Sequence, residues 1–285
     1  MKILITGARG MLGKEVSAVF AAKHTVIATD IPELDITNPI HINNWVLKHK
    51  PDIILHLAAM TDVDGCEKNP EAAFKINISG TKNIADACRE NKIQLLYIST
   101  SDIFDGTKKT PYIETDIANP INKYGKSKYE GELYIRQILP NSYIIRTCWL
   151  FGGGRDDKKF VARIIAQAKS RKSLDVVNNI YGSPTYTKDL AHAIFRITGN
   201  NRPGIYHTAN AGCCSRYEIA EKIIEYSGIS TCKINGVSGD KFPTIAPRPR
   251  MAAIESVNLS KVGLDNLIRP WQEALREYIK RELEM

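Results

Sequence analysis

The chain has 285 residues, of which 43% are hydrophobic and 25% are charged. This composition excludes a disordered chain and a collagen-like or coiled-coil fibre, and the length predicts one large domain or two closely joined ones. No stretch approaches the roughly 20 apolar residues of a membrane span, and none of the six cysteines has CxxC spacing. We therefore expect a cytoplasmic protein with no metal site and no membrane partner.

The formal net charge is +8, because 39 Lys and Arg residues outnumber 31 Asp and Glu residues. A basic excess of this size is compatible with nucleic acid, an anionic membrane or anionic small molecules. The basic residues form short clusters, such as Arg171-Lys172 and Arg248 with Arg250, and no run of five like charges occurs. We interpret most of them as solvated surface, expect no nucleic-acid partner, and retain phosphate-bearing small molecules as ligands.

In the first half of the chain, short apolar runs alternate with helical patterns. Strands are predicted over residues 2–6, 25–28, 53–57, 95–98 and 143–145, and helices over 12–20, 39–49, 70–90 and 122–139. The runs are apolar throughout, which is typical of a parallel sheet covered on both faces. The alternation predicts an α/β fold with a doubly wound, Rossmann-type parallel sheet.

After Trp149 the alternation becomes less regular. Helical patterns cover 160–172 and 188–198, and prolines punctuate the last 80 residues. We predict a larger domain over residues 1–150 plus about 173–200, and a smaller C-terminal substrate-binding lobe over about 151–172 and 201–285.

The predicted first strand runs directly into a glycine-rich turn. Gly7, Gly10 and Gly13 have GxxGxxG spacing and stand between this strand and the next helix. Glycines allow the backbone to turn tightly and to approach a pyrophosphate, whose charge meets the amides at the helix N-terminus. The context favours a dinucleotide site over a strand–helix turn without ligand, so the larger domain is predicted to bind a dinucleotide.

Two charged residues bear on the choice of dinucleotide. Asp30 ends the second predicted strand, where a carboxylate usually holds the ribose hydroxyls of NAD. Arg9, inside the glycine turn, favours the 2′-phosphate of NADP instead. The sequence therefore leaves NADH and NADPH open as cofactors.

Tyr124 and Lys128 are four residues apart in a predicted helix, so they lie on one face, one turn apart. A nearby ammonium stabilises a phenolate and is expected to lower the pKa of the tyrosine toward working pH. This makes Tyr124 a candidate general acid or base. Thr100 follows the fourth predicted strand, at the sheet edge where ligands bind, and its hydroxyl is placed to hydrogen-bond a substrate carbonyl.

These motifs together resemble the extended short-chain dehydrogenase/reductases, and the whole chain more closely resembles the dTDP-4-dehydrorhamnose reductase family. The resembling segments span the chain in order: Ile36–Asn38, Ala58–Asp64, Tyr97–Thr100, Phe104–Gly106, Pro120–Lys128, Arg146–Leu150, Gly182–Thr185, Arg248-Pro249 and Trp271.

The resemblance implies that NADPH or NADH reduces the 4-keto group of dTDP-6-deoxy-L-lyxo-4-hexulose to give dTDP-L-rhamnose, with Thr100, Tyr124 and Lys128 catalytic. The implied cofactor site comprises Gly7, Arg9, Gly10, Met11, Leu12, Gly13, Asp30, Asp35, Ile36, Ala58, Ala59, Tyr124 and Lys128. The implied substrate residues are Thr100, Asp102, Trp149 and Arg248, with Trp149 facing the sugar and Arg248 approaching the diphosphate. A homodimer is the family's expectation.

The chain departs from the family pattern near Thr100. Family members usually continue with Asp-Tyr, whereas this chain has Ser101-Asp102, so an aromatic residue is missing and an acid has moved by one position. Some family members hold Mg²⁺ at the dimer interface with carboxylates. Glu15 is present here, but Lys188 and Arg281 stand where two partners are expected, so we predict no metal.

Other functions remain open at this point. Ser101-Asp102 is compatible with a reductase of a related nucleotide-activated 4-keto sugar. A non-catalytic NAD(P)-binding regulatory subunit, like that of methionine adenosyltransferase, also resembles this family, but the retained Thr100, Tyr124 and Lys128 disfavour it. A nucleotide-sugar dehydratase is disfavoured because such enzymes usually follow the threonine with Asp-Glu.

Overall fold

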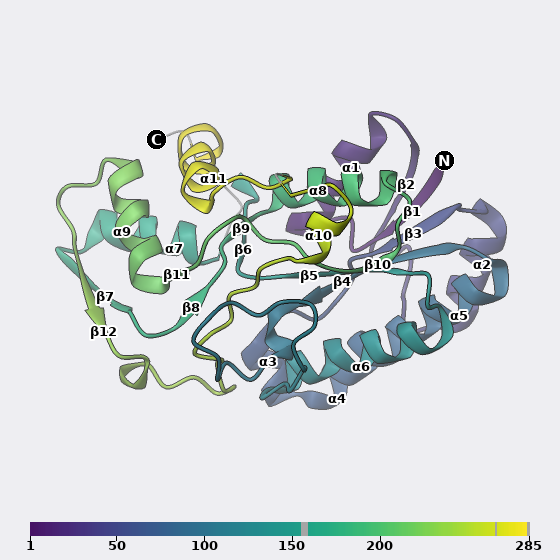
Figure 1. The fold of residues 1–285 in the computed structure, drawn as a ribbon, viewed down its shortest axis with the longest axis horizontal. Coiled ribbons are helices and arrows are strands. Elements are labelled where there is room, and N and C mark those ends of the chain that lie inside the picture. The colour runs from purple at the N-terminus through teal and green to yellow at the C-terminus, as the bar shows by residue number, and fades with distance from the viewer. Residues whose placement is uncertain (155–158, 266, 284–285) are drawn as a thin grey trace.

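The fold is that of a computed structural model, which describes residues 1–154, 159–265 and 267–283 (Figure 1). Its centre is a six-stranded parallel sheet in the order β10-β5-β4-β3-β1-β2. The strands are β1 (Lys2–Thr6), β2 (Thr25–Thr29), β3 (Ile53–His56), β4 (Gln94–Thr100), β5 (Tyr143–Thr147) and β10 (Gly204–His207). The first five confirm the predicted strands, and their parallel pairing confirms the Rossmann-type sheet.

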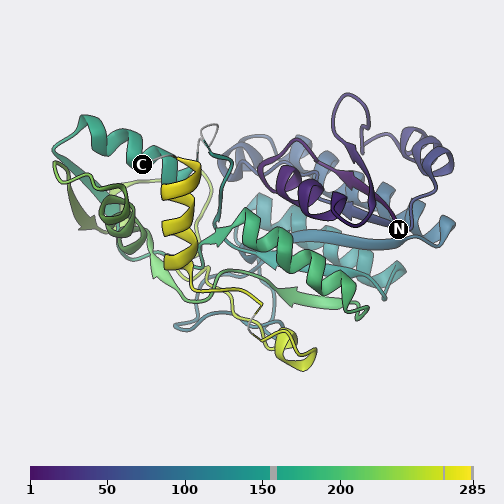
Figure 2. The same ribbon diagram turned by 90° about the horizontal axis from the view of Figure 1, so that it is seen from above.

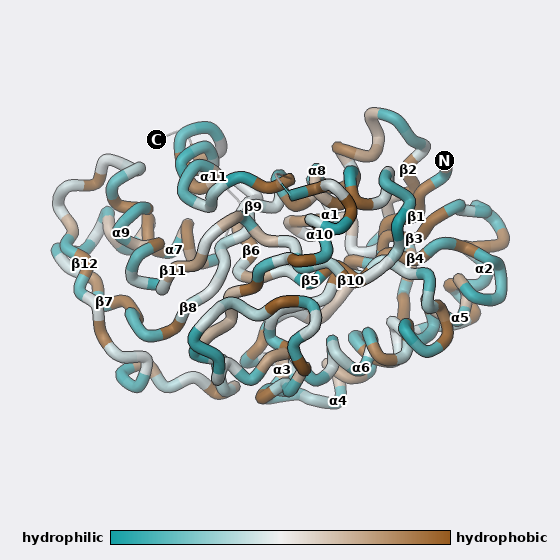
Figure 3. The backbone as a smooth tube through the Cα atoms, in the orientation of Figure 1, coloured by the Kyte–Doolittle hydropathy of each residue, from teal (hydrophilic) through white to brown (hydrophobic). Residues whose placement is uncertain are grey.

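Helices cover both faces of this sheet. They are α1 (Met11–Ala21), α2 (Pro39–His49), α5 (Thr81–Asn91), α6 (Lys123–Ile138) and α8 (Thr187–Gly199). Ile3 and Ile5 of β1 pack with α1 and α8, whereas Leu4 packs with α2, α5 and α6. Because successive strand side chains point to opposite faces, an uninterrupted apolar run fills both cores. Figure 3 shows the strands near β1 and β3 as predominantly hydrophobic.

The segment between β3 and β4 is helical almost throughout. Helices α3 (Val63–Lys68) and α4 (Pro70–Phe74) are followed by a π-helical turn over Lys75–Gly80, which continues into α5. The predicted helix over 70–90 is therefore confirmed as α4, this turn and α5. A 3-10 turn over Ser101–Ile103 follows β4.

The order in which strands are added to the sheet reverses at β1, because β2 lies on one side of it and β3 on the other. Ligands of open parallel sheets bind outside the carboxyl ends of the strands at such a switch point. Thr6 and His56, which end β1 and β3, are in register with Tyr97 of β4, and β4 continues to Thr100. Gly7, Ala58 and Thr100 therefore lie along one edge of the sheet, which becomes the candidate site.

A smaller lobe lies at the end of the molecule away from β2 and α2, as Figures 1 and 2 both show. Its elements include α7 (Phe160–Ser170), β7 (Ser173–Val177), α9 (Arg216–Ser227), β12 (Lys233–Val237) and α11 (Trp271–Glu277). Short pairs connect it to the sheet: β6 (Leu150–Phe151) with β9 (Thr185–Tyr186), and β8 (Tyr181–Gly182) with β11 (Cys214–Ser215). The lobe has its own core, in which Trp271 and Tyr278 are buried. Helix α10 (Asn258–Lys261) packs against β10.

Two strands lie elsewhere than the sequence-based division places them. The division assigns β10 to the lobe, but β10 pairs with β5 and extends the central sheet. It assigns β7 to the larger domain, but β7 pairs with β12 in the lobe. Both strands are short and pair with partners far away in the chain, so their own residue pattern does not say which sheet they join.

Within residues 1–154, 159–265 and 267–283, none of the helices is both long and apolar enough to cross a membrane.

Candidate active site

The glycine turn between β1 and α1 places backbone where side chains would otherwise stand. Gly7 has a φ of +71°, and a Cβ there would lie 2.7 Å from the backbone nitrogen of Ala58. A Cβ at Gly13 would lie 2.2 Å from the carbonyl oxygen of Gly7. Gly10 is the N-cap of α1, whose first amides have no partner within the helix. A close-packed turn at a helix N-terminus suits a pyrophosphate.

Met11 and Leu12 form the first turn of α1. Leu12 is buried in the core beneath the turn. Met11 faces the loop after β6, since a Cβ at Gly153 would lie 3.3 Å from Met11 Cγ. Met11 therefore points toward the loop that leads into the smaller lobe, whereas Leu12 points into the core.

Arg9 and Asp30, which favour different cofactors, lie together at the end of β2. Asp30 accepts hydrogen bonds of 3.0 Å from the Arg9 amide and 2.9 Å from the Ile31 amide. The Arg9 guanidinium donates to the Ile31 carbonyl oxygen at 2.9 Å and forms an ion pair with Glu33. The Asp30 carboxylate is therefore positioned where it could accept hydrogen bonds from ribose hydroxyls. Arg9 lies beside it and is already paired with Glu33.

The remaining predicted cofactor residues, Asp35, Ile36, Ala58 and Ala59, differ in burial and in hydrogen bonding. The amide and hydroxyl of Thr37 both donate to Asp35 Oδ1 at 2.8 Å, and these bonds hold the pKa of Asp35 below its ordinary value. Ile36 is buried, and a Cβ at Gly80 would lie 2.7 Å from its side chain, so Ile36 packs into the core. Ala58 and Ala59 follow β3 at the edge of the sheet and are half-buried.

Helix α6 brings the predicted catalytic pair to the end of β4. A Cβ at Gly125 would lie 2.0 Å from the carbonyl oxygen of Asp102, so only glycine allows this close approach. Here the Thr100 side chain faces the Tyr124 hydroxyl closely enough to influence its pKa. Lys128 lies one turn further along α6. The structure thus assembles the three predicted catalytic residues at the sheet edge.

The protonation of Tyr124 differs from the expectation that Lys128 lowers its pKa. Burial raises the pKa of Tyr124 above its ordinary value, the Asp102 carboxylate adds to this, and the Thr100 side chain only partly opposes it. The expected lowering is therefore wrong for the protein without ligands. Tyr124 is a phenol at neutral pH, which is the form that donates a proton.

Lys128 is 3% exposed, which is unusual for a lysine. Burial lowers its pKa to about 7, although the Glu132 carboxylate opposes the shift. The Lys128 Nζ lies 4.1 Å from the centre of the Tyr97 ring. Lys128 is therefore close to the balance between ammonium and amine at neutral pH.

A cavity of about 650 Å³ lies between the sheet edge and the smaller lobe, and Asp102, Trp149 and Arg248 all line it. These are three of the four predicted substrate residues. Trp149 has a φ of +41°, a left-handed conformation that is strained for a tryptophan. Its indole lies against Gly182, where a Cβ would be 2.4 Å from the ring. The strained backbone thus fixes an aromatic wall of the cavity.

The sequence reasoning missed Arg216, the first residue of α9, which also lines this cavity. Its guanidinium carbon lies 3.5 Å from the centre of the Trp149 ring and 4.8 Å from that of Phe160. Within the residues that the structure describes, the guanidinium has no hydrogen bond and no ion pair. Burial lowers the pKa of Arg216 to about 10, so it remains a cation at neutral pH. No local pattern connects these three residues, which are distant in the sequence.

The other charges of the cavity leave it positive. Arg163, Arg171 and Lys241 line it together with Asp175, and Lys241 pairs with Asp175 at 2.6 Å. Arg248 is 3.0 Å from Asp64 Oδ1 and also donates to the Ala246 carbonyl oxygen at 3.1 Å. The cavity is therefore suited to an anionic ligand.

Asp102 is the acid that stands one position later than in the family pattern. It lines this cavity, whereas Ser101 is buried. Burial raises the pKa of Asp102, and the cations Arg248 and Arg216 oppose this shift. An acidic side chain therefore stands beside Tyr124, where the family pattern has an aromatic residue.

The residues considered for a metal are engaged otherwise. Lys188 and Arg281 pair with Glu277 at 3.1 and 3.6 Å. Among the described residues, no group of three His, Cys, Asp or Glu side chains is arranged to hold a metal ion.

A doubly wound sheet, a glycine turn at its switch point, and Thr100, Tyr124 and Lys128 at the same edge define a Rossmann-type NAD(P)-binding oxidoreductase of the short-chain dehydrogenase/reductase class. The family model described as RmlD substrate binding domain matches residues 1–284.

A dTDP-4-dehydrorhamnose reductase of Mycolicibacterium smegmatis is 37% identical over 281 residues, which are 98% of this chain and 85% of the relative. A crystal structure of a dTDP-4-dehydrorhamnose reductase from Clostridium acetobutylicum has a TM-score of 0.94 and 38% identity, covering 98% of this chain and 99% of that one. A structure of the Bacillus anthracis enzyme in complex with NADP has a TM-score of 0.92 and 35% identity, covering 98% of both chains. The chain belongs to the dTDP-4-dehydrorhamnose reductase family.

Proposed function

We propose that this chain reduces the 4-keto group of dTDP-6-deoxy-L-lyxo-4-hexulose to dTDP-L-rhamnose, with NADPH or NADH as hydride donor. The observation that carries the proposal is the junction of two features. Thr100, Tyr124 and the buried Lys128 lie at one edge of the sheet, and the cationic cavity opens beside them. Ketone reduction on an anionic substrate needs both.

The chemistry at the keto oxygen is assigned to Tyr124 and Thr100. Because Tyr124 keeps its proton at neutral pH, it gives that proton to the substrate oxygen as the carbonyl carbon is reduced. Thr100 hydrogen-bonds the same oxygen and orients it. Lys128, as an ammonium, stabilises the resulting phenolate and binds the nicotinamide ribose.

The glycine turn supports the cofactor assignment. Cβ atoms at Gly7 and Gly13 would collide with the backbone of Ala58 and Gly7, so glycines allow the turn to pack tightly at the helix N-terminus, where a pyrophosphate binds. When bound, the reduced nicotinamide supplies the hydride. Asp30 is placed for the ribose hydroxyls, and Arg9 is near enough to serve a 2′-phosphate if it leaves Glu33.

The cavity residues are assigned to the dTDP-sugar. Trp149 packs beside the sugar, and Arg248 and Arg216 bind the diphosphate, since guanidinium groups match phosphate oxygens in bidentate fashion. In this assignment residues 1–150 with α8 and β10 form the cofactor domain, and the smaller lobe closes over the nucleotide sugar.

A direct assay tests the proposal. The protein is incubated with the dTDP-4-keto sugar and NADPH or NADH, and loss of reduced-nicotinamide absorbance is followed while NMR identifies the sugar product. We expect turnover and a rhamno-configured product. A folded protein that turns over with neither cofactor would contradict the proposal and favour the non-catalytic NAD(P)-binding subunit.

Asp102 favours a second candidate, a reductase of a related nucleotide-activated 4-keto sugar. A carboxylate in place of an aromatic side chain changes the hydrogen bonding available to the sugar. A relative from Streptomyces niveus, named dTDP-4-keto-6-deoxy-D-glucose reductase, is 33% identical over 276 residues. The same assay with both keto sugars, compared by kcat/KM, decides between the candidates.

We further propose that the protein works in the cytoplasm, where nucleotide sugars and reduced nicotinamides are available. We also propose that it forms a homodimer, as its family resemblance implies. Light scattering of the purified chain tests the dimer, because a mass near that of one 31.8 kDa chain would contradict it.

A further inference from the structure

Helix α6 carries a third ionisable residue behind the catalytic pair. Tyr124, Lys128 and Glu132 are spaced by four residues, so they lie along one face of the helix. Glu132 is fully buried, and its carboxylate raises the pKa of Lys128 against the effect of burial. The proposed reaction assigns no role to this carboxylate.

Arg146 of β5 fixes the Glu132 carboxylate. Arg146 Nε lies 3.1 Å from Oε1 and 3.2 Å from Oε2, and Arg146 Nη2 donates to Oε2 at 2.7 Å. Both side chains are almost completely buried. A bidentate pair of this kind holds the carboxylate in one orientation against a fixed positive charge.

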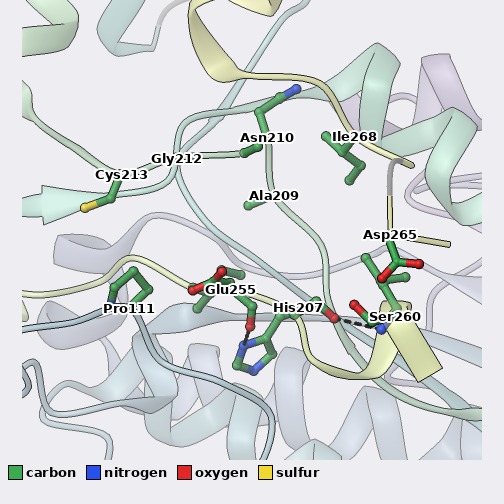
Figure 4. A pocket seen from close by; sticks show the side chains of 14 residues that line it. Pro111, His207, Ala209, Asn210, Gly212, Cys213, Glu255, Ser260, Asp265 and Ile268 are labelled. Atoms are coloured by element: carbon green, nitrogen blue, oxygen red, sulfur yellow. Dashed lines mark hydrogen bonds between the residues drawn. The ribbon is translucent and has the colours of Figure 1, made fainter. Parts of the chain in front are cut away.

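His207 of β10, the register partner of Arg146, supports the guanidinium from the other side. His207 Nδ1 is 3.0 and 3.1 Å from the carbonyl oxygens of Tyr112 and Glu255, so it donates to them. His207 Nε2 therefore accepts from Arg146 Nη1, at 3.3 Å. Figure 4 shows His207 in the wall of a second cavity, of about 350 Å³, with its hydrogen bond to Glu255.

The histidine adds no charge to this arrangement. Burial lowers the pKa of His207 to about 4, although the neighbouring Glu114 opposes the shift. The imidazole is therefore neutral at working pH. The Glu132 carboxylate on α6 is therefore paired with the Arg146 guanidinium and receives no second positive charge from His207.

Within the described residues, Glu132 is the one anionic neighbour of Lys128, and the other groups around it are neutral. Tyr124 lies one turn earlier on α6, and Tyr97 of β4 lies beneath the ammonium. His56 of β3 is neutral, because burial and Lys128 lower its pKa to about 3. The π-helical turn and α5 contribute the neutral side chains of Asn77 and Thr81, bonded to Ser127 and His56.

We propose that Glu132 is a positioning residue for the reduction: clamped by Arg146, its carboxylate keeps Lys128 in the ammonium form that binds the cofactor ribose and supports proton donation by Tyr124. The effect of this charge on the reduction rests on the proposed function. The effect of Glu132 on the charge of Lys128 does not, because it can be measured in the protein without cofactor or substrate.

The test is the titration of Lys128 in the protein without cofactor, followed by NMR of isotopically labelled lysine and assigned with Lys128→Met. Wild type is expected to titrate near pH 7. Glu132→Gln should lower the midpoint by about one pH unit or more, because it removes the opposite charge. Glu132→Asp keeps the charge and should return the midpoint close to that of wild type. Glu130→Gln, on the same helix, is the control for a removed surface charge.

Glu132→Gln leaves Arg146 without a partner and is expected to lower stability. The double variant Glu132→Gln/Arg146→Gln removes both buried charges and is expected to lower the Lys128 midpoint as well. The pH at which NADPH affinity falls should move to lower pH in parallel, measured by nicotinamide fluorescence.

An unshifted Lys128 midpoint in Glu132→Gln or in the double variant would overturn the inference. Equal shifts in Glu132→Gln and Glu132→Asp would also overturn it, since they would show a packing role only. Absence of turnover in wild type would instead contradict the proposed function, and the titration would still decide the role of Glu132.

Discussion

The guanidinium carbon of Arg216 lies 3.5 Å from the centre of the Trp149 ring, and Gly182 packs against the same indole. The strained backbone of Trp149 and the close approach of Gly182 fix the indole, and the indole in turn orients the arginine. A cation held in this way by aromatic rings, and not by a carboxylate, keeps its N–H donors available for an anion. This relationship is the strongest structural reason for placing a phosphate in the cavity.

Arg216→Met should weaken dTDP binding by roughly 10- to 100-fold, because it removes charge-assisted hydrogen bonds. The dTDP affinity of Arg216→Lys should lie between those of wild type and Arg216→Met, since lysine keeps the charge but lacks the planar guanidinium. Calorimetric titration with dTDP measures both, with the exposed Arg136→Met as a matched loss of charge. Equal dTDP affinity in Arg216→Met and wild type would refute the phosphate contact.

Tyr124→Phe should lower kcat by roughly 100-fold or more, because no proton donor would remain at the keto oxygen. NADPH binding should change little, since the ring and Lys128 stay in place. Tyr134→Phe is the matched control on the same helix, as its hydroxyl donates to Asp86 of α5 at 2.8 Å. Single-turnover assays with both variants measure the effect, and a normal rate in Tyr124→Phe would exclude it as the donor.

Gly13→Ala should abolish cofactor binding or destabilise the glycine turn, because its Cβ would lie 2.2 Å from the Gly7 carbonyl oxygen. Gly199→Ala provides the comparison, since nothing lies within 4 Å of a Cβ there. We expect Gly199→Ala to leave NADPH affinity and the melting temperature nearly unchanged. NADPH titration and thermal unfolding compare the two variants. Wild-type NADPH affinity in Gly13→Ala would contradict the prediction, because it would show that the turn can accommodate a Cβ at this position.

Lys128→Met should raise stability while abolishing turnover. The pKa of Lys128 is about 7 in the folded protein and about 10.4 in an unfolded chain. Between these values the unfolded state binds more protons, so this residue makes the protein more stable as pH rises from 7 toward 10. Removing the lysine should therefore flatten that pH dependence. Urea unfolding at several pH values measures it, and an unchanged slope would show that Lys128 is not desolvated.

Glu33→Gln should increase the preference for NADPH over NADH, by roughly 3- to 10-fold, because it releases Arg9 for a 2′-phosphate. In the structure Arg9 is paired with Glu33. Asp30 is left in place, so NADH binding should change less. The ratio of kcat/KM for the two cofactors measures the effect, and a ratio equal to that of wild type would place Arg9 outside the cofactor site.

The sequence by itself predicted the elements whose cause is local. The apolar runs of β1 to β5, the glycine turn and the spacing of Tyr124 and Lys128 are periodic patterns, and each corresponds to an observed element. The family resemblance also pointed to Asp102, Trp149 and Arg248, and all three line one cavity.

Only the tertiary structure decided which sheet β7 and β10 join, the stacking of Arg216 on Trp149, and the protonation of Tyr124 and Lys128. Strand pairing joins segments that are far apart in the chain, so no local pattern contains it. A pKa depends on the total desolvation and on charges from several elements, as Glu132 and Arg146 show, and these distances exist only in the folded chain.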